Sequence, residues 1–403
     1  MNAPAGTDLV GVRLEERTAA GERFFAAEAD RIARLCHRMA ERFVRGGRLI
    51  ALGAGGADRS DVRHVTVEFV HPVIVGKRAL PALGLSAEGG PLAAQAGLVV
   101  EPEDIAIAFG DGPDVTAALA VCTRRGALTI AFADAGAEWR FAPPSEDPFV
   151  RQELVETLYH VLWELVHVFL DNRGLLTGRR GGAVHDAGAS SFLYPFLSER
   201  EDDLEAVVAD VRASIVMKAA EVGALRAQTL GEGRETLRAA AAELRAAFAR
   251  GGRLLALGNG GSATDAMDAV ADFHAPPAGS GWTARPALDL TEDPAILTAL
   301  ANDIGVEAMF SRQVIAHGRP GDVVLAFSTS GGSANVILAL EEARRRDLRT
   351  IALVGYDGGR ILSERLADHV VVSRSEHIPR IQEAQASAYH VLRELVETDG
   401  APV

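Results

Sequence analysis

Residues 250–263 read RGGRLLALGNGGSA, and this stretch contains the pattern that decides the fold. Its paired glycines are typical of a helix C-terminus. Leu254–Leu257 then form a short apolar run, as expected of a strand covered on both faces of a parallel sheet. Three glycines follow, and Ser262 stands where the next helix should begin. A strand, a glycine-rich turn and a helix N-terminus predict an anion site made of backbone N–H groups, although a tight turn without a ligand uses similar glycines.

A second stretch of the same kind makes the anion site the better interpretation. Residues 327–335, FSTSGGSAN, follow the apolar residues Val323–Ala326 and lead into another helix. Turns at the carboxyl ends of strands in one doubly wound sheet converge on one crevice. The two hydroxyl-bearing turns therefore predict a phosphate pocket.

The chain contains an internal repeat. Residues 45–53, RGGRLIALG, differ from 250–258 at one position, and YHVLWELV at 159–166 differs from YHVLRELV at 389–396 at one position. The first match has an offset of 205 residues and the second of 230, so the second copy is longer by 25 residues. We therefore predict two diverged copies of one domain, at 1–171 and 201–403, joined by a glycine-rich linker at 172–200.

The alternation of apolar strands and amphipathic helices predicts an α/β fold with a doubly wound sheet in each half. In the first half we expect a helix at 20–45, an irregular segment at 135–147 and a long helix at 148–170. Its strands are expected at 48–52, 80–85, 104–109 and 127–132. In the second half we expect helices at 201–228 and 233–249 and a final helix near Pro379, with strands at 253–257, 286–290, 322–327, 349–354 and 369–372.

Composition limits the partners and the compartment. The 403 residues carry a formal net charge of −14, which argues against nucleic acid or an anionic membrane as the main partner. Cys36 and Cys122 are the only cysteines, so the sequence offers no disulfide framework and no paired-cysteine metal site. The N-terminus has no apolar signal core, and no run is long enough to span a membrane. We expect a cytoplasmic protein.

The second half resembles the phosphoheptose isomerase family of SIS (sugar isomerase) domains. The resemblance rests on GNGGSATDA, TEDPAILTALANDIG, GDVVLAFSTSGGSANV, GYDGG and RIQEAQASAYH, which occur in the family's order. The first half resembles a degenerate copy. The resemblance implies two αβα sandwiches, each a doubly wound, mostly parallel sheet of five strands flanked by helices. It also implies assembly into tetramers with sites at subunit interfaces, and a sugar phosphate substrate, often with zinc.

The resemblance places the phosphate and sugar contacts in the second half. The matching positions are Asn259, Gly260, Gly261, Ser262, Asn302, Asp303, Ser328, Thr329, Ser330, Ser333 and Gln382. In the first half, Gly110, Asp111 and Gly112 stand at the place of Ser328, Thr329 and Ser330. Asp111 would repel a phosphate, so we expect that only the second half binds one.

The metal and proton-transfer positions of the family show the opposite distribution. The complete set is found in the first half as His64, Glu68, Gln152 and His160, which we predict as divalent metal ligands, zinc by ligand type. Gln152 and His160 are separated by about 12 Å on a straight helix, so both reach one ion only if Gln152 lies in an irregular first turn. The second half keeps Gln382 and His390, while Asp268 and Asp272 replace the family's His and Glu. We further interpret Glu164 and Glu394 as partners that orient His160 and His390.

The sequence thus predicts a ketose–aldose isomerase of the phosphoheptose type, acting through an enediolate on a sugar such as sedoheptulose 7-phosphate. The catalytic candidates are Glu68 as base with His160, and Asp272 with His390. The two halves would either form a composite site or leave the chemistry to the second half alone. A non-catalytic phosphosugar-binding regulator or assembly protein is the alternative. We expect a homodimer, which would form a pseudo-tetramer of SIS domains.

Overall fold

The structure is a computed structural model that describes residues 8–73, 77–171, 176 and 203–398. The chain divides into two compact units, and neither is continuous in sequence. The second-sheet unit comprises residues 1–19, 147–153 and 221–403, and the first-sheet unit comprises 20–146 and 154–220. Three helices therefore begin in one unit and end in the other: α1 (Leu9–Val44), α5 (Pro148–Asp171) and α7 (Leu204–Ala249).

Each predicted domain, 1–171 and 201–403, encloses one sheet. The compact units differ from these ranges because residues 1–19 and 147–153 of the first half belong to the second-sheet unit, and the start of the second half, up to Ala220, belongs to the first-sheet unit. The predicted linker at 172–200 lies outside the described residues except for Leu176.

The first sheet has five parallel strands in the order β2-β1-β3-β4-β5. Its central strands are short and wholly buried, as their apolar runs predict. The two-residue strand β5 lies in the segment that was expected to be irregular, and this expectation was wrong because two residues carry no readable period. The elements are β1 (Leu49–Gly53), α2 (Ala57–Val70), β2 (Ala82–Ser86), α3 (Leu92–Val99), β3 (Ile105–Ala108), α4 (Pro113–Arg124), β4 (Leu128–Ala131) and β5 (Trp139–Arg140).

The second sheet has the order β10-β9-β8-β6-β7, again all parallel. Numbered from the first strand of its own half, each sheet has the order 2-1-3-4-5. All five predicted strands of this half are confirmed, and so is the α/β fold class. The elements are β6 (Leu254–Leu257), α8 (Gly261–His274), β7 (Ala287–Asp289), α9 (Pro294–Asp303), α10 (Met309–His317), β8 (Val323–Ser328), α11 (Ala334–Arg345), β9 (Arg349–Gly355), α12 (Gly359–Ser363), β10 (His369–Ser373) and α13 (Ile378–Thr398).

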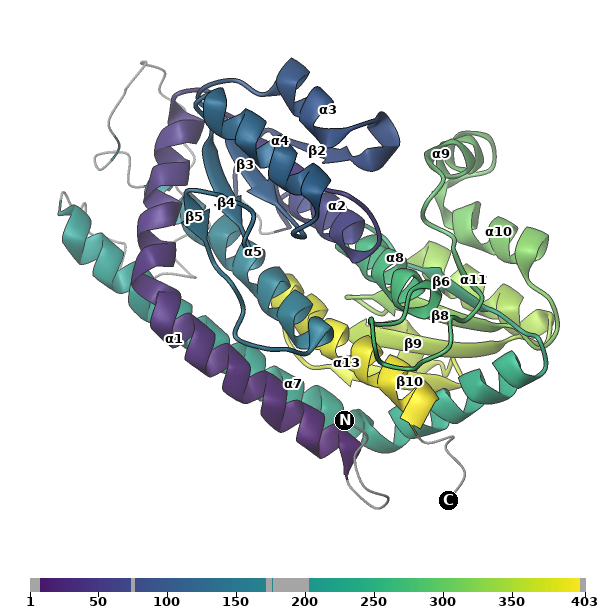
Figure 1. The fold of residues 1–403 in the computed structure, drawn as a ribbon. Helices are drawn as coiled ribbons and strands as arrows, with labels where there is room; N and C mark the ends of the chain where they lie inside the picture. The colour runs from purple at the N-terminus through teal and green to yellow at the C-terminus, as the bar shows by residue number, and fades with distance from the viewer. Residues whose placement is uncertain (1–7, 74–76, 172–175, 177–202, 399–403) are drawn as a thin grey trace. The chain divides into compact units, whose positions relative to one another are not determined.

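Helices cover both faces of the second sheet (Figure 1). Successive strand residues point to opposite faces. Leu254 and Leu325 accordingly pack with α7, α8 and α13, whereas Leu255 and Val324 pack with α10 and α11. This alternation produces the three-layer αβα sandwich and leaves the carboxyl ends of the strands open for the loops that follow them.

Helix α7 is continuous where the sequence predicted two helices. The break was expected between residues 228 and 233, but the helix runs through Gly231 and Gly233 without interruption. Leu230 and Leu237, seven residues apart, are fully buried in the core and hold one face of the helix on the sheet. A Cβ built on Gly233 would lie 2.9 Å from Val371 Cγ1 of β10, so the glycine permits close packing. Helix α1 likewise begins at Leu9 rather than near residue 20.

Candidate functional site

The turn after β6 is shaped by its glycines. Gly260 has a φ of 59°, and a side chain at Gly258 would collide with the backbone of Ser262. Helix α8 starts at Gly261, so its first N–H groups and the buried Ser262 line the turn. A helix N-terminus of this kind favours an anion.

The turn after β8 supplies hydroxyl groups. Gly331 N donates to Ser328 Oγ at 3.2 Å, and Gly332 N donates to Ser330 Oγ at 3.2 Å. Ser333 precedes helix α11, and its Oγ lies 3.4 Å from Ser328 Oγ. We call this turn, residues 328–333, and the turn at 258–262 the phosphate loops.

A reciprocal amide pair joins the two phosphate loops. Asn259 Nδ2 donates to Asn335 Oδ1 at 2.9 Å, and Asn335 Nδ2 donates to Asn259 Oδ1 at 2.8 Å. Because both amides are used in the pair, it fixes the loops relative to each other. The predicted convergence of the loops therefore has a structural basis. Asn302 and Asp303 instead bond to each other at the exposed end of α9, and no described contact brings them to the loops.

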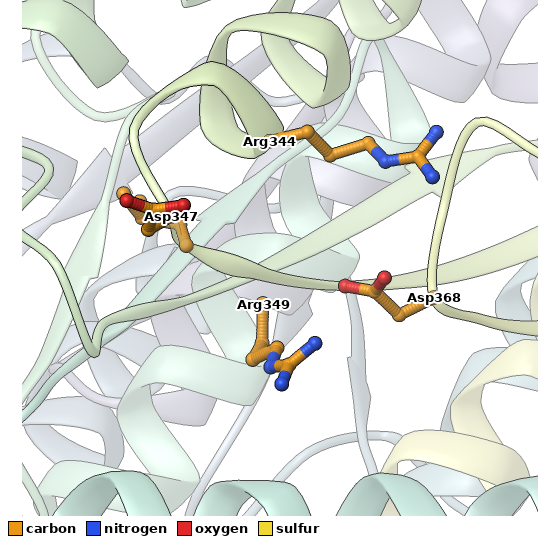
Figure 2. Close-up of a pocket in the computed structure, with 5 residues that line it drawn as sticks. Arg344, Asp347, Arg349 and Asp368 are labelled. Atoms are coloured by element: carbon orange, nitrogen blue, oxygen red, sulfur yellow. The ribbon is translucent and has the colours of Figure 1, made fainter.

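Two hollows lie at opposite ends of the second sheet. The larger, about 780 Å³, adjoins the phosphate loops and is lined by Ser330, Tyr356, Asp357, Arg374, Ser375 and Glu376. The smaller, about 260 Å³, lies at the amino ends of β9 and β10, and Arg344, Asp347, Arg349 and Asp368 are among the residues that line it (Figure 2). Ligands of open α/β sheets bind outside the carboxyl ends of the strands, so the larger hollow belongs to the candidate site.

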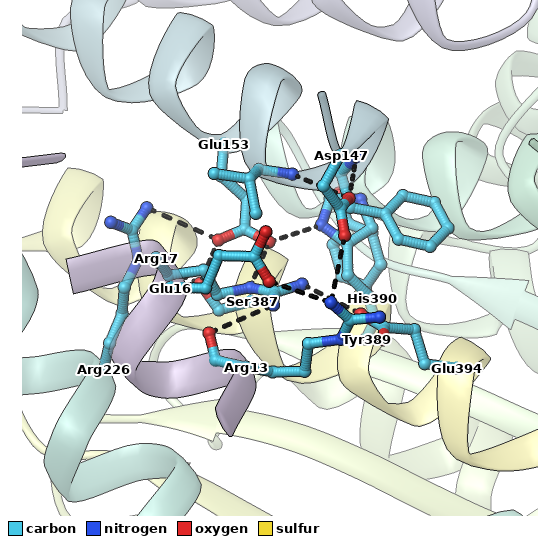
Figure 3. A network of polar contacts seen from close by, with 12 residues as sticks. Arg13, Glu16, Arg17, Asp147, Glu153, Arg226, Ser387, Tyr389, His390 and Glu394 are labelled. Atoms are coloured by element: carbon cyan, nitrogen blue, oxygen red, sulfur yellow. Dashed lines mark hydrogen bonds and ion pairs between the residues drawn. The ribbon is translucent and has the colours of Figure 1, made fainter. Parts of the chain in front are cut away.

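A buried histidine centre lies in the same compact unit as the phosphate loops (Figure 3). His390 on α13 is fully buried, and its Nδ1 lies 2.9 Å from Glu153 Oε1 of α5. Its Nε2 lies 3.6 Å from Asp268 Oδ2 and 3.5 Å from Asp272 Oδ2, both on α8. Tyr389 Oη donates to Asp268 Oδ2 at 2.5 Å, and its ring packs edge-on against Phe327, the residue before the second phosphate loop.

Charge balance explains the protonation of this centre. Burial opposes the charge on His390, but hydrogen bonding to Asp268 and Glu153 and the charge of Asp272 raise the pKa of His390 to about 10. Burial also opposes ionisation of Glu153, yet Arg17 and His390 hold the pKa of that carboxyl well below its ordinary value. Burial, and next the charge of Asp268, raise the pKa of Asp272 well above its ordinary value. The centre therefore contains an imidazolium, and Asp272 is a stronger base than an ordinary carboxylate.

The first-sheet unit contains a different histidine centre. His64 Nε2 and His160 Nε2 lie 3.3 Å apart, and Glu156 completes a group whose ligand atoms are all within 4.8 Å of one another. Burial, together with His160, lowers the pKa of His64 well below its ordinary value, which favours the neutral imidazole that metals bind. Two nitrogens bound tetrahedrally to zinc at about 2.0–2.1 Å would also be about 3.3 Å apart. These residues fit zinc, and Glu68 Oε1, 4.0 Å from His64 Nε2, is a further candidate ligand.

The predicted metal ligand Gln152 also lies on helix α5. Helix α5 begins at Pro148, so Gln152 lies within its regular turns and two turns from His160. Gln152 thus lies beyond the first turn of α5, and its place among the ligands stays a prediction. Glu156, one turn closer to His160, is in the group.

The acid-rich group of the second-sheet unit fits a metal less well. Asp268, Asp272 and His390 also have ligand atoms within 4.8 Å of one another. However, hydrogen bonding to Asp268 and Glu153 and the charge of Asp272 raise the pKa of His390, which favours a proton on Nε2 over a lone pair for a metal. Gln382 is buried on α13, two turns before His390.

One other sequence interpretation needs correction, that of Glu394, whereas the role of Glu164 beside His160 stays a prediction. Glu394 does not orient His390: it is bound by Arg13 and by Arg17 Nη2, the latter at 3.3 Å. Glu164 is paired with Lys218. Both glutamates follow their histidine by one helical turn, and that spacing alone does not reveal the cations that other helices bring to them.

The first half carries a carboxylate of its own at the phosphate position. A side chain at Gly110 would collide with the carboxylate of Asp58, which lies in the first turn of α2. This carboxylate adds to the charge of Asp111. The first-half turn that corresponds to the hydroxyl-bearing turn after β8 is therefore acidic.

Sequence reasoning missed Glu153, Glu156 and Tyr389. The repeat contained a signal for Glu153, because the same offset that aligns the two histidines also aligns Glu153 with Glu383. Each of these glutamates follows the glutamine that was singled out. No comparable signal marks Glu156, whose counterpart is Ala386.

The fold and the phosphate loops define the SIS domain class. The SIS domain signature matches residues 219–355. Over 156 residues the chain is 47% identical to the phosphoheptose isomerase of Citrifermentans bemidjiense, covering 38% of this chain and 78% of that one. Over 195 residues it is 41% identical to the phosphoheptose isomerase of Desulfovibrio desulfuricans, covering 47% of this chain and 89% of that one. The chain belongs to the phosphoheptose isomerase family of SIS-domain proteins.

The likeness of fold extends across both halves. The C-terminal domain of glucosamine-fructose-6-phosphate aminotransferase from Francisella tularensis aligns with a TM-score of 0.60 at 10% identity, covering 98% of this chain and 97% of that one. Tagatose-6-phosphate ketose/aldose isomerase from Escherichia coli aligns with a TM-score of 0.54 at 15% identity, covering 100% and 98%. The whole chain therefore has the architecture of a two-sheet SIS protein. Among the described residues, no helix has the length and apolar composition needed to cross a bilayer.

Proposed function

We propose that the protein is a sugar-phosphate isomerase that interconverts a ketose and an aldose, with a phosphoheptose such as sedoheptulose 7-phosphate as substrate. The observation that carries the proposal is the Asn259–Asn335 amide pair, which joins two anion-binding loops in the unit that also holds a buried acid–base centre. The phosphoheptose isomerase relatives support the substrate class.

The phosphate loops would orient the substrate. Backbone N–H groups at the start of α8 and the hydroxyls of Ser262, Ser328, Thr329, Ser330 and Ser333 would bind its phosphate. Helix α8 then rises by about 10 Å from Gly261 to Asp268, so its acidic residues lie some distance from the phosphate. This separation suits a sugar whose carbonyl is remote from its phosphate.

Asp272 and His390 would move the protons. Asp272 Oδ2 accepts no hydrogen bond among the described residues, and its raised pKa suits a base that removes the proton next to the carbonyl. The charged His390, whose Nε2 faces Asp272, would stabilise the oxyanion that develops.

The first-sheet centre is proposed as a zinc site held by His64, His160 and Glu156, with Glu68 beside them. Bound zinc would supply a Lewis acid that polarises a carbonyl. In a composite site Glu68 and His160 would replace Asp272 and His390 as the proton-transfer pair.

The test is turnover of sedoheptulose 7-phosphate by the full chain and by two matched variants, Asp272→Asn and Glu68→Gln. We expect Asp272→Asn to abolish turnover while phosphosugar binding, measured by calorimetry, survives. Loss of turnover in Glu68→Gln alone would assign the chemistry to a composite site. Binding without turnover by the unchanged protein would contradict the isomerase proposal.

That last outcome would support a non-catalytic phosphosugar-binding regulator or assembly protein. The observation that favours this second function is the replacement of the family's His and Glu by Asp268 and Asp272. We further propose a cytoplasmic homodimer arising from a tandem duplication. A mass near 42.5 kDa by light scattering, that of one chain, would refute the dimer.

A further inference from the structure

Helix α5 holds the ring of His390 with two residues on one of its faces. Phe149 stacks on the imidazole, with ring centroids 4.5 Å apart and planes 15° apart, and Glu153 Oε1 lies 2.9 Å from Nδ1. The two residues are four positions apart, so they lie on the same face of α5. One fixes the plane of the ring and the other its rotation within that plane.

Glu153 is itself held firmly (Figure 3). Arg17 Nε donates to its Oε1 at 2.8 Å, and Ser387 Oγ donates to its Oε2. Arg226 Nη2 lies 3.7 Å from the same Oε2. With 1% of the residue exposed, Glu153 has no solvent shell in which to relax, so its carboxylate is a fixed acceptor.

This arrangement leaves one nitrogen of His390 for chemistry. An ionised carboxylate only accepts hydrogen bonds, so Nδ1 carries a proton toward Glu153. Nε2 then points to Asp268 and Asp272 on α8, the helix that starts at the first phosphate loop.

We propose that Glu153, contributed by the first half of the sequence, is the positioning residue of the His390 centre, fixing the imidazole so that Nε2 faces Asp272 and the substrate. The inference rests on the proposed function of His390 in proton transfer. It also gives the exchanged segment 147–153 a role, because Phe149 and Glu153 both lie within it.

The test compares Glu153→Gln with a matched control, Glu394→Gln. Both glutamates are buried and bound by Arg17, but Glu394 does not contact His390 in any described interaction. We expect Glu153→Gln to lower kcat for sedoheptulose 7-phosphate by at least about tenfold at unchanged KM. Glu153→Asp, which keeps the carboxylate, should recover part of kcat, and Glu394→Gln should leave it within about threefold of the unchanged protein, as expected of a structural ion pair.

A second readout does not need turnover. The charged groups described next to His390 are Glu153 on α5 and Asp268 and Asp272 on α8. Arg17 on α1 and Arg226 on α7 bind Glu153, and the charge of Arg393 on α13 acts on Asp272. In ¹⁵N NMR we expect the titration of His390 to move to lower pH in Glu153→Gln and to stay in place in Glu394→Gln. Equal effects of the two variants on titration and on kcat would overturn the positioning role. If the unchanged protein has no turnover but the two variants still differ in the titration of His390, the isomerase proposal is rejected while the positioning role of Glu153 stands.

Discussion

Two glycines of helix α7 provide a test of the fold at the place where the sequence was misleading. Gly231 is exposed, and a Cβ built on it would meet no atom within 4 Å. Replacing a glycine in a helix interior by alanine stabilises the helix by about 0.5–1 kcal/mol. We therefore expect Gly231→Ala to raise the free energy of unfolding by about that amount.

Gly233→Ala should have the opposite sign. Its Cβ would lie 2.9 Å from Val371 Cγ1, inside the usual carbon–carbon contact distance of about 3.5–4.0 Å. Overpacking a tight site costs about 1–3 kcal/mol, which exceeds the gain in helix propensity. A net loss of up to about 2 kcal/mol should follow, since the β-branched Val371 is stiff and almost fully buried.

Urea denaturation of both variants, and of Gly233→Ala combined with Val371→Ala, measures these terms. The cost of Gly233→Ala should largely disappear in the Val371→Ala background, as a double-mutant cycle would show. Equal changes for Gly231→Ala and Gly233→Ala would refute the close approach of α7 and β10. No stabilisation by Gly231→Ala would indicate that the helix breaks where the sequence suggested.

Three further predictions concern the two centres and the phosphate loops. Ser330→Ala should weaken binding of sedoheptulose 7-phosphate by about 1–3 kcal/mol in calorimetry, while Gly112→Ala at the corresponding first-half position should leave the affinity unchanged. Equal losses of affinity in the two variants would contradict the assignment of the phosphate site to the second half. The pKa of His390 is raised from 6.5 to about 10, so its stabilisation is fully present below pH 6.5 and is lost as the pH rises through 10. Between pH 6.5 and 10, His390 should make the free energy of unfolding fall by about 1.4 kcal/mol per pH unit. In His390→Gln the dependence on pH should be shallower by that amount, and an identical slope in the two proteins would contradict a charged imidazole. Bound zinc, measured by atomic absorption, should be lost in His64→Ala and kept in His390→Ala, and the reverse result would exchange the assigned centres.

The sequence was sufficient for the features that depend on local patterns. The buried apolar runs predicted every strand except β5 within two residues, and the turns at 258–262 and 328–333 were placed by their glycines and hydroxyls. It was insufficient wherever a distant partner decides the outcome. The glycines of α7 are tolerated because Leu230, Leu237 and Val371 pack around them, which no local window reveals.

The same limit explains the errors at the histidines. The spacing of His390 and Glu394 suggested a pair on one helix, but Arg13 and Arg17 of α1 bind that glutamate. Glu153 takes its place from a helix 237 residues earlier in the chain. Pairings across such separations depend on which helices meet in the fold.

The exchange of short segments between the units has a consequence for the stability of the second half. Arg17 and Glu153 belong to the first half of the sequence, whereas His390 belongs to the second. A polypeptide that began at residue 201 would keep the phosphate loops but would leave His390 Nδ1 without the carboxylate that neutralises it, and an uncompensated buried charge is strongly destabilising. The His390 centre therefore depends on a few side chains of the first half, although the position in that half that corresponds to the phosphate loop is acidic, and we expect a protein without them to be less stable.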